Sequence, residues 1–337
     1  MNIQNCIKEL HEGVTLPEDR SLELFNAIFA GEVNEVRLAS ILTALSVRGE
    51  TSQEIVGAAL SMRSFATKLP ISDNGFFDTC GTGGDHSHSF NISTAVALIL
   101  CSMGVPMAKH GNRSMTSKSG SADFLEALGV PIGLSGDEAA AYFRRHGFIF
   151  LYAPNYHPAM KHAVPVRRAL GVRTIFNFLG PLTNPLAPKR QVVGVFHPRH
   201  LPLYARAAAC LPYERILVYS ADSGMDEVSP VEPTHVVDVH GGTERSFSID
   251  PDAYITPAEA AGLPFQNSAE ENAAAFMETI MSAEPTPLGK LLALNTALAL
   301  YALNGEEGFA RRYGRALDLV HSGQVARKVN EMREAAR

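Results

Sequence analysis

Small, hydroxyl-bearing and charged side chains gather in one stretch of this 337-residue chain, between residues 78 and 129. The stretch reads DTCGTGGDHSHSFNISTAVALILCSMGVPMAKHGNRSMTSKSGSADFLEALG. Glycines let backbone N–H groups approach an anion closely, and helix N-termini add unpaired N–H donors and a favourable dipole. Such a run is poorly suited to a hydrophobic core. It therefore predicts a site that holds a phosphate-bearing ligand.

The glycine cluster at 81–85, GTGGD, follows a predicted strand. It matches neither GxGxxG nor GxxxxGK[ST], so neither a dinucleotide fingerprint nor a Walker loop is predicted. Asn91, Ser93 and Thr94 then precede an apolar run at 95–100, and as helix N-caps alone they would be structural. Because a glycine loop and a polar helix start follow each other directly, the pair favours an anion site over simple capping.

A second polar run, KHGNRS at 109–114, stands where another strand is predicted to end, and SKSGS at 117–121 opens the next helix. Ligands of open α/β sheets bind at the carboxyl ends of the strands. A solvated loop is the alternative interpretation. Because such loops rarely stand between two apolar elements, ligand binding is favoured.

Two acidic neighbours, Asp226 and Glu227, follow a predicted strand at 216–219. Adjacent carboxylates usually mark a turn, and we expect both side chains to be exposed. Beside a phosphate site, however, hard oxygen ligands are what Mg²⁺ requires. Of the neighbours Arg167 and Arg168, one can hold a carboxylate-bearing ligand through two parallel hydrogen bonds. Asp226 and Glu227 are therefore predicted to be metal ligands, and Arg167 or Arg168 is predicted to bind the carboxylate of a ligand, as a carboxylate clamp.

Composition limits the class of protein. The formal net charge of −6 gives no whole-chain attraction to nucleic acid or an anionic membrane. The sequence has no run of eighteen apolar residues, so no membrane span is predicted. The first residues lack the apolar core of a signal peptide. The four cysteines lack metal-binding spacing, which favours reduced thiols in the cytoplasm. The histidines show neither HxxxH nor HExxH spacing, although His86, His88, His110 and His157 lie near the predicted site.

The elements that must position these residues fall into two groups. Residues 1 to about 70 predict only helices, whose apolar residues recur at helical spacing. We expect more apolar surface there than one small lobe can bury, and hence a homodimer through this lobe. The residues that carry this expectation are Leu22, Phe25, Phe29, Leu38, Ile41 and Leu45.

From about residue 75 onward, short apolar runs alternate with helical stretches, which predicts an α/β sheet with helical crossovers. An antiparallel hairpin is predicted through Gly241-Gly242, and the tail is helical again. Predicted strands lie at 76–77, 105–108, 148–152, 191–196, 216–219, 234–239 and 244–249, and predicted helices at 93–103, 121–128, 137–146, 203–209, 268–281, 287–303 and from 308 onward.

The segment 157–184 interrupts this alternation. Residues 157–170 predict one helix, kinked at Val164-Pro165, and residues 174–184 predict a compact, turn-rich piece. We expect this block to pack on the N-terminal helices. The predicted organisation is therefore a helical domain at 1–72, completed by about 157–184, and an α/β domain at 73–337 with a central, mainly parallel sheet flanked by helices.

The motifs GTGGD, FNIST, KHGNRS, SKSGSAD, HPAMKHAVPVRRALGVRTIFNFLGPLTNP and MDEVSP occur in this order. With them the chain resembles the anthranilate phosphoribosyltransferase family over essentially its whole length. The resemblance implies an enzyme that joins the amine of anthranilate to C1 of 5-phosphoribosyl-1-pyrophosphate and releases pyrophosphate, the second step of tryptophan synthesis from chorismate. It also implies a fold of the nucleoside phosphorylase type and a homodimer through the helical domains.

The resemblance assigns residues to each ligand and none as a general base. It implies magnesium, two ions per active site, at Ser93, Asp226 and Glu227, and anthranilate at Gly81, Asn112 and Arg167. The chain departs from the family pattern at Cys80, at His86 and His88, and at Ser89, which replaces a frequent threonine. The contacts implied for phosphoribosyl pyrophosphate are Gly81, Gly84, Asp85, Ser89, Asn91, Ile92, Ser93, Thr94, Lys109, His110, Gly111, Asn112, Arg113, Ser114, Ser117 and Ser121.

Two other functions remain as alternatives. Phosphorolysis of pyrimidine nucleosides shares the fold and the phosphate loop, but the acidic pair and the Asn112–Arg167 pair argue against it. A nucleic-acid-binding relative that has lost the chemistry should carry a strongly basic face, whereas this chain is acidic overall.

Overall fold

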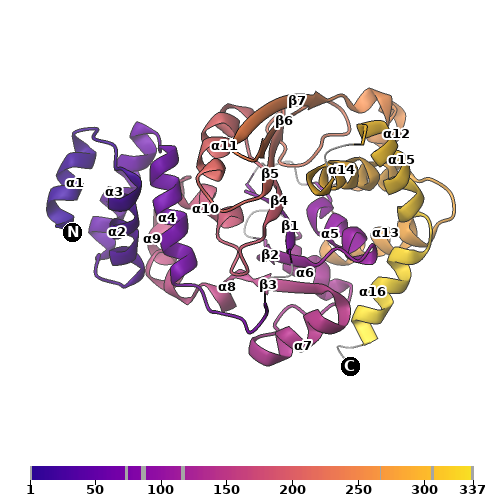
Figure 1. Ribbon diagram of the computed structural model, residues 1–337, viewed down its shortest axis with the longest axis horizontal. Coiled ribbons are helices and arrows are strands. Elements are labelled where there is room, and N and C mark those ends of the chain that lie inside the picture. The colour runs from indigo at the N-terminus through magenta and orange to yellow at the C-terminus, as the bar shows by residue number, and fades with distance from the viewer. Residues whose placement is uncertain are drawn as a thin grey trace.

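The computed structural model describes residues 2–72, 75–84, 89–114, 118–265, 267–304 and 307–334. Its N-terminal part is a bundle of four helices, each begun by the local sequence. The Asn2 and Asn34 side chains cap the first and third helices, and Thr51 and Glu54 form a reciprocal capping box at the fourth. Figure 1 shows this bundle to one side of the sheet. The helices are α1 (Ile3–His11), α2 (Glu18–Phe29), α3 (Glu35–Arg48) and α4 (Ser52–Ser64).

The apolar face of this bundle is buried within the chain, which corrects the reason given for a dimer. Of the six residues expected to exceed what one lobe can bury, Phe25, Phe29, Leu38, Ile41 and Leu45 are buried, and Leu22 is half-buried. They are covered by neighbouring helices and by side chains of the segment 163–211. Exposed apolar side chains of the bundle are different ones, such as Val36 and Val47 on α3.

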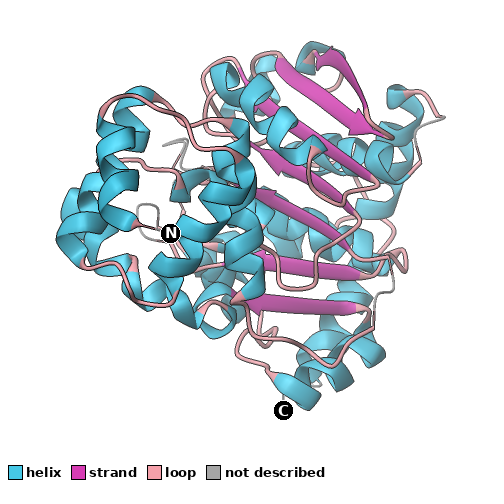
Figure 2. Ribbon diagram, turned by 60° about the vertical axis from the view of Figure 1, so that its left-hand side comes forward, coloured by secondary structure: helices cyan, strands magenta, loops and turns pink. Residues whose placement is uncertain are grey.

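The α/β part is built on one sheet of seven strands, in the order β3-β2-β1-β4-β5-β6-β7. The first five strands run parallel, and the last two form the expected antiparallel hairpin. Figure 2 shows the strands side by side, with helices on both faces. The strands are β1 (Phe77–Gly81), β2 (Met107–Gly111), β3 (Phe148–Tyr152), β4 (Arg190–Gly194), β5 (Arg215–Ala221), β6 (Thr234–His240) and β7 (Thr243–Ile249).

Successive side chains of the central strands enter two different cores, because a strand points alternate residues to opposite faces. Val192 and Leu217 pack with the C-terminal helices, whereas Val193 and Val218 pack with the N-terminal bundle and α11. The helices that flank the sheet are α5 (Ile92–Ser102), α6 (Ser121–Ala127), α7 (Gly136–His146), α11 (Leu201–Ala209), α12 (Pro257–Ala261), α13 (Ala269–Met281), α14 (Pro287–Leu303), α15 (Phe309–Val320) and α16 (Gln324–Glu334), with two short turns, η2 (Pro198–His200) and η3 (Pro251–Ala253).

The segment between β3 and β4 packs on the bundle: the Phe176 ring lies 6.0 Å from that of Phe25 and 6.2 Å from that of Phe29. Its local structure corrects two expectations. The single kinked helix is wrong, because Pro165 stands in the first turn of a new helix, where a missing N–H is tolerated. The turn-rich piece contains a helix. The elements are α8 (Ala153–Tyr156), η1 (Pro158–His162), α9 (Val164–Leu170) and α10 (Phe176–Leu182).

Within the described ranges, no helix combines the length and the apolar character that crossing a lipid bilayer requires.

Candidate active site

The predicted polar motifs converge at the carboxyl edge of the parallel strands. The chain leaves β1 toward β2 on one side, whereas β4 and β5 lie on the other, so the crevice between β1 and β4 is a topological switch point. Gly81 and Gly194 end these two strands and lie side by side. A Cβ atom on Gly81 would lie 2.4 Å from Asp226 Oδ2, and one on Gly194 would lie 1.7 Å from the Asp226 carbonyl oxygen. Glycine is therefore required at both strand ends to admit Asp226.

The acidic pair is buried, which corrects the expectation of exposure: Asp226 is 8% and Glu227 6% exposed. The Gly83 N–H donates to Asp226 Oδ2 at 2.7 Å. The Ser93 N–H donates to Glu227 Oε1 at 3.1 Å, and the Tyr219 hydroxyl lies 3.4 Å from the other oxygen. These contacts bring the acidic pair, the glycine loop and the start of α5 into one cluster. Two carboxylates and the Ser93 hydroxyl there are hard oxygen donors of the kind that suits Mg²⁺.

Lys109 lies under this cluster and is 1% exposed. Its ammonium donates to the Thr79 carbonyl oxygen at 2.5 Å and lies 3.5 Å from Ser93 Oγ. Thr79 Oγ1 in turn donates to the Ser93 carbonyl oxygen at 2.7 Å. Lys109 thus supports the end of β1 and the start of α5, and its charge lies below the predicted phosphate site.

A buried carboxylate, Asp78, directly precedes Thr79 in β1. It accepts hydrogen bonds from Asn184 Nδ2 at 2.9 Å and from Gln191 Nε2 at 3.3 Å. Burial raises the pKa of Asp78 to about 6, although the positive charge of Lys109 acts in the opposite direction. The sequence interpretation missed Asp78. A charged residue inside the apolar run FFDTC was the available signal, because aspartate is rarely buried without partners.

The side chain of Asn91 does not cap α5, so the simple capping interpretation is wrong for this residue. Its Oδ1 accepts from Ser119 Oγ at 2.7 Å and from Asn272 Nδ2 at 2.9 Å, and its Nδ2 donates to the Ser119 carbonyl oxygen. Asn91 therefore connects the first polar motif to the second and to α13. The contribution of Asn272 was not predicted from the sequence.

Arg113 and Asn112, in the second motif, are exposed and differ in their contacts. The Arg113 guanidinium pairs with Asp123 at 2.7 Å and with Glu126 at 2.8 Å, so carboxylates of α6 already offset its charge. Ser121 Oγ lies 3.4 Å from the Asn112 carbonyl oxygen, and the Ser114 N–H donates to Asp123. This motif therefore offers backbone and hydroxyl groups more readily than a free cation.

His110, on β2, and His157, directly after α8, form a buried pair. Nδ1 of His110 lies 3.1 Å from the Gly180 carbonyl oxygen, and the Nε2 atoms of the two rings are 3.2 Å apart. Because a carbonyl oxygen only accepts, His110 carries its proton on Nδ1 and accepts from His157 on Nε2. Burial lowers the pKa of His110 to about 3 and that of His157 to about 4, so both rings are neutral at physiological pH.

The predicted carboxylate clamp, Arg167, lies on α9 and stacks its guanidinium 5.1 Å from the centre of the Phe176 ring. Burial lowers the pKa of this half-buried side chain. Within the described residues, no hydrogen bond joins Arg167 to Asn112. Arg167 lies on α9, which packs on α3 of the bundle, whereas Asn112 directly follows β2 of the sheet.

The remaining predicted residues lie around the same edge. Ile92 and Thr94 are buried in the first turn of α5, and Gly84, Ser89 and Gly111 are half-buried. A Cβ atom on Gly111 would lie 2.6 Å from Ser121 Oγ, so Gly111 brings the two motifs together. Asp85 and Ser117, like His86 and His88, lie outside the described residues.

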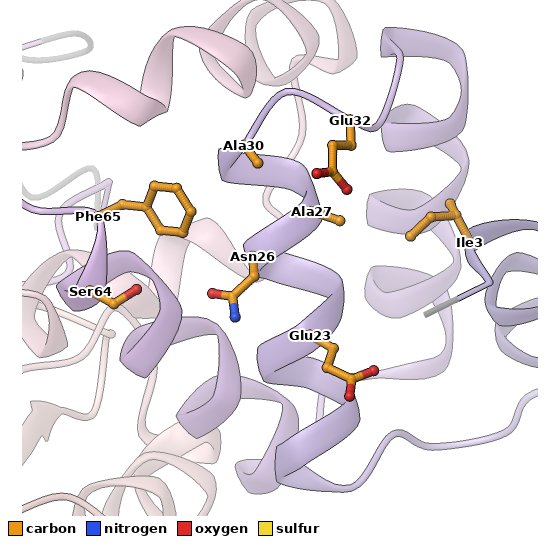
Figure 3. A pocket seen from close by; sticks show the side chains of 8 residues that line it. All are labelled: Ile3, Glu23, Asn26, Ala27, Ala30, Glu32, Ser64 and Phe65. Carbon is orange, nitrogen blue, oxygen red and sulfur yellow. The ribbon is translucent and has the colours of Figure 1, made fainter.

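A groove of about 410 Å³ lies elsewhere, on the helical bundle (Figure 3). Its charged lining residues are Glu23 and Glu32, and its apolar ones include Ile3 and Phe65. Acidic side chains disfavour a polyanionic ligand. This groove therefore does not compete with the strand edge as the phosphate site.

Comparison with known proteins matches both parts of the chain to one family. The helical bundle domain of the glycosyl transferase family matches residues 4–66, and the a/b domain of that family matches residues 73–326. The anthranilate phosphoribosyltransferase of Acetivibrio thermocellus is 40% identical over 336 residues, which cover 98% of this chain and 96% of the relative. That of Laribacter hongkongensis is 38% identical over 333 residues, covering 98% and 97%.

Solved structures show the same fold. The crystal structure of the anthranilate phosphoribosyltransferase from Thermus thermophilus superimposes with a TM-score of 0.90, at 36% identity and with both chains fully covered. The enzyme from Saccharomyces cerevisiae, solved in complex with PRPP and Mg, gives a TM-score of 0.87 at 24% identity, covering 99% of this chain and 97% of the other. With a family match across both lobes and relatives this similar over their whole length, the chain belongs to the anthranilate phosphoribosyltransferase family of glycosyltransferases.

Proposed function

We propose that this protein transfers the phosphoribosyl group of 5-phosphoribosyl-1-pyrophosphate to the amine of anthranilate, giving N-(5-phosphoribosyl)anthranilate and pyrophosphate in tryptophan biosynthesis. The observation that carries the proposal is the cluster of Asp226 and Glu227 with Gly83 and Ser93 at the carboxyl edge of the sheet. This cluster offers neutral N–H donors and hard oxygen ligands in one place. Both are what a magnesium-bound pyrophosphate requires.

In this proposal, Ser93, Asp226 and Glu227 hold magnesium, two ions per active site. The fit is supported by the glycine at position 81, since a side chain there would collide with Asp226 Oδ2, which the Gly83 N–H fixes. The relative from Saccharomyces cerevisiae, solved in complex with PRPP and Mg, agrees with the choice of ion. When bound, magnesium stabilises negative charge on the departing pyrophosphate.

The bond between ribose C1 and the pyrophosphate oxygen breaks, and a bond from C1 to the amine nitrogen forms while the nitrogen loses one proton. Glycosyl transfer develops positive charge on the sugar and negative charge on the leaving group. We propose that the Gly81–Gly84 loop, the start of α5 and Lys109 stabilise the phosphate groups through N–H, hydroxyl and ammonium donors. Because the aromatic amine is a neutral nucleophile, we assign no residue as a general base.

Anthranilate binding is assigned to Gly81, Asn112 and Arg167. Arg167 supplies the paired hydrogen bonds that suit a carboxylate, and its stacking on Phe176 holds the guanidinium plane in place. His110, on β2, and His157, which follows α8, are both neutral and join the sheet to the segment between β3 and β4. The remaining residues predicted for phosphoribosyl pyrophosphate keep that assignment as a proposal.

We also propose the domain division of the sequence analysis: residues 1–72 with about 157–184 as one domain, and 73–337 as the other. Packing of Phe176 on Phe25 and Phe29 supports it. A homodimer through the helical domain stays a prediction, now on the ground of exposed Val36 and Val47 on α3, which are 82% and 84% exposed. Sedimentation of the protein and of a Val36→Ser/Val47→Ser variant tests it: a monomeric parent protein contradicts the proposal. The cytoplasmic location is likewise a prediction.

The decisive experiment follows anthranilate fluorescence during incubation with phosphoribosyl pyrophosphate and Mg²⁺, together with release of pyrophosphate. We expect one pyrophosphate per anthranilate consumed and no reaction when either partner or the metal is omitted. Inorganic phosphate with a pyrimidine nucleoside is the matched alternative pair. Turnover of that pair, with none of anthranilate, would replace the proposed reaction by phosphorolysis.

A further inference from the structure

A ligand with several phosphate groups is stabilised by positive charge nearby, and the assigned cations differ in the contacts that they already make. The Lys109 ammonium is buried and donates to the Thr79 carbonyl oxygen. Arg113 pairs with two carboxylates of α6. Arg167 is assigned to the carboxylate of anthranilate. Beyond Lys109 and the proposed Mg²⁺, a further cation at the glycine loop would strengthen the binding of phosphoribosyl pyrophosphate.

Arg173 is exposed in the connection between α9 and α10 and has the required position. Its guanidinium donates to the Gly84 carbonyl oxygen in the glycine loop. Its backbone is fixed on the helical bundle, where Ser46 Oγ on α3 donates to the Arg173 carbonyl oxygen at 3.1 Å. One residue thus joins the helical lobe to the phosphate-binding loop.

The Arg173 guanidinium is held over the ring of Phe196, 4.0 Å from its centre, at cation–π distance. Phe196 follows β4 and is buried, and its N–H donates to Thr82 Oγ1 at 3.0 Å. The aromatic platform and the loop that Arg173 contacts are therefore connected to each other. A side chain held at both ends loses less entropy when a ligand arrives.

The charge of Arg173 is not offset by its described neighbours. In the described part of the chain, no carboxylate lies within ion-pair distance of its guanidinium. His200 packs on Phe196, and burial lowers its pKa to about 4, with Arg199, His197 and Arg173 contributing in the same direction. His200 is therefore neutral at physiological pH and adds no competing charge. Among the described residues, then, no carboxylate offsets the positive charge that Arg173 brings to the loop.

We propose that Arg173 is a positioning residue for phosphoribosyl pyrophosphate: it fastens the glycine loop to the helical lobe and places a positive charge beside the bound phosphates. This inference rests on the proposed function, and it adds a residue that the sequence motifs did not assign. A purely structural role would affect both substrates equally, whereas the proposed role affects phosphoribosyl pyrophosphate. Loss of the guanidinium must weaken the binding of phosphoribosyl pyrophosphate more than that of anthranilate.

The test compares Arg173→Met, which keeps the length and removes the charge, with Arg173→Lys, which keeps the charge and loses the planar fork. The matched control is Arg144→Met on α7, an exposed arginine near the opposite edge of the sheet. Steady-state kinetics give KM for each substrate, calorimetry gives the Kd of phosphoribosyl pyrophosphate with Mg²⁺ alone, and thermal melting reports stability.

We expect Arg173→Met to raise the KM and Kd for phosphoribosyl pyrophosphate about tenfold, with less than a twofold change in the anthranilate KM and an unchanged melting temperature. Arg173→Lys should lie between the parent protein and Arg173→Met, and Arg144→Met should match the parent.

Equal loss for both substrates, or a fall in melting temperature alone, would make Arg173 merely structural and overturn the inference. Full recovery by lysine would overturn the proposed fastening of the loop. Failure of the parent protein to turn over phosphoribosyl pyrophosphate refutes the proposed function instead, so the two failures are distinguishable.

Discussion

Two sets of buried carboxylates in this chain have opposite surroundings. Glu54, in the helical bundle, pairs with Arg48 at 2.5 Å and accepts the N–H groups of Leu16 and Thr51 at 2.9 Å. Asp226 and Glu227, at the strand edge, accept from the neutral N–H groups of Gly83 and Ser93 and from a tyrosine hydroxyl.

The comparison separates a carboxylate that stabilises a fold from carboxylates that serve a ligand. The Arg48 guanidinium offsets the Glu54 charge inside the chain. This carboxylate therefore needs no bound ligand or ion to balance its charge. Among the described contacts, the N–H groups of Gly83 and Ser93 orient Asp226 and Glu227, and glycines at 81 and 194 leave room for Asp226. Burial alone therefore does not distinguish a structural carboxylate from one that serves a ligand, and the groups that each carboxylate contacts must be compared as well.

The largest effect is expected from removing both charges at the strand edge. Asp226→Asn together with Glu227→Gln keeps the size of the buried side chains and removes the anionic ligands of Mg²⁺. We expect turnover to fall roughly a thousandfold or more, because metal and electrostatic stabilisation of a leaving group is worth several kcal/mol. Circular dichroism and thermal melting should show a folded protein. The exposed pair Glu244→Gln/Asp252→Asn is the control, and near-normal turnover in the buried double variant would remove these residues from the mechanism.

Glu54→Gln should have the opposite signature, a loss of stability without a loss of chemistry. The change leaves the Arg48 charge unbalanced and places an amide donor against backbone N–H donors. We expect the free energy of unfolding to fall by about 3–4 kcal/mol. Urea denaturation measures it, with exposed Glu12→Gln as control, and kcat/KM of the protein that remains folded should not change. A specific loss of kcat/KM would show that the comparison is wrong.

Asp78 provides an intermediate case, with a pH dependence of stability. Its pKa of about 6 in the folded protein exceeds the ordinary value of 3.8, so the folded state binds this proton more tightly than the unfolded state. The resulting stability is fully present below about pH 4 and is lost as pH rises to about 6, amounting to about 3 kcal/mol. Asp78→Asn should therefore gain stability relative to the parent across this window in denaturation at pH 4–7. Asp137→Asn, an exposed change, should show no such gain, and parallel curves for parent and Asp78→Asn would contradict the assignment.

The smallest effect is expected at the aromatic side of the crevice. Arg167→Lys keeps a positive charge but loses the paired hydrogen bonds and the stacking on Phe176. We expect the KM for anthranilate to rise about tenfold, which corresponds to about 1.4 kcal/mol, with little change for phosphoribosyl pyrophosphate. Arg168→Lys, next to it and exposed, is the control. A larger rise for phosphoribosyl pyrophosphate would make Arg167 a phosphate contact.

Elements with a strong local signal were predictable from the sequence. Thr51 and Glu54 form the capping box that their spacing indicates, and the apolar run at 148–152 is a strand with the predicted bounds. The hairpin through Gly241-Gly242 also occurs as expected. Each of these depends on interactions within a few residues, which the sequence itself contains. The single kinked helix predicted for 157–170 was wrong because proline is tolerated in the first turn of a helix as well as causing a kink.

The motifs of the site were likewise visible in the sequence, but their surroundings were not. Asp226 follows its own strand by a few residues, and nothing nearby in sequence indicates that Gly81 and Gly194 enclose it. The order of the strands brings these three residues together, and that order depends on packing across the whole sheet. The same long-range packing buries the bundle residues that had predicted an exposed dimer face.

The sequence by itself determined which local elements form and which residue types can hold a phosphate, because periodicity, capping and glycine freedom are properties of short stretches. Only the tertiary structure decided which charges are already offset. Arg113 and Arg173 look alike in the sequence, yet one is paired with carboxylates of α6 and the other lies over Phe196 at the glycine loop. Electrostatic interactions act through space, so the role of a charge depends on neighbours that the fold brings from distant parts of the chain.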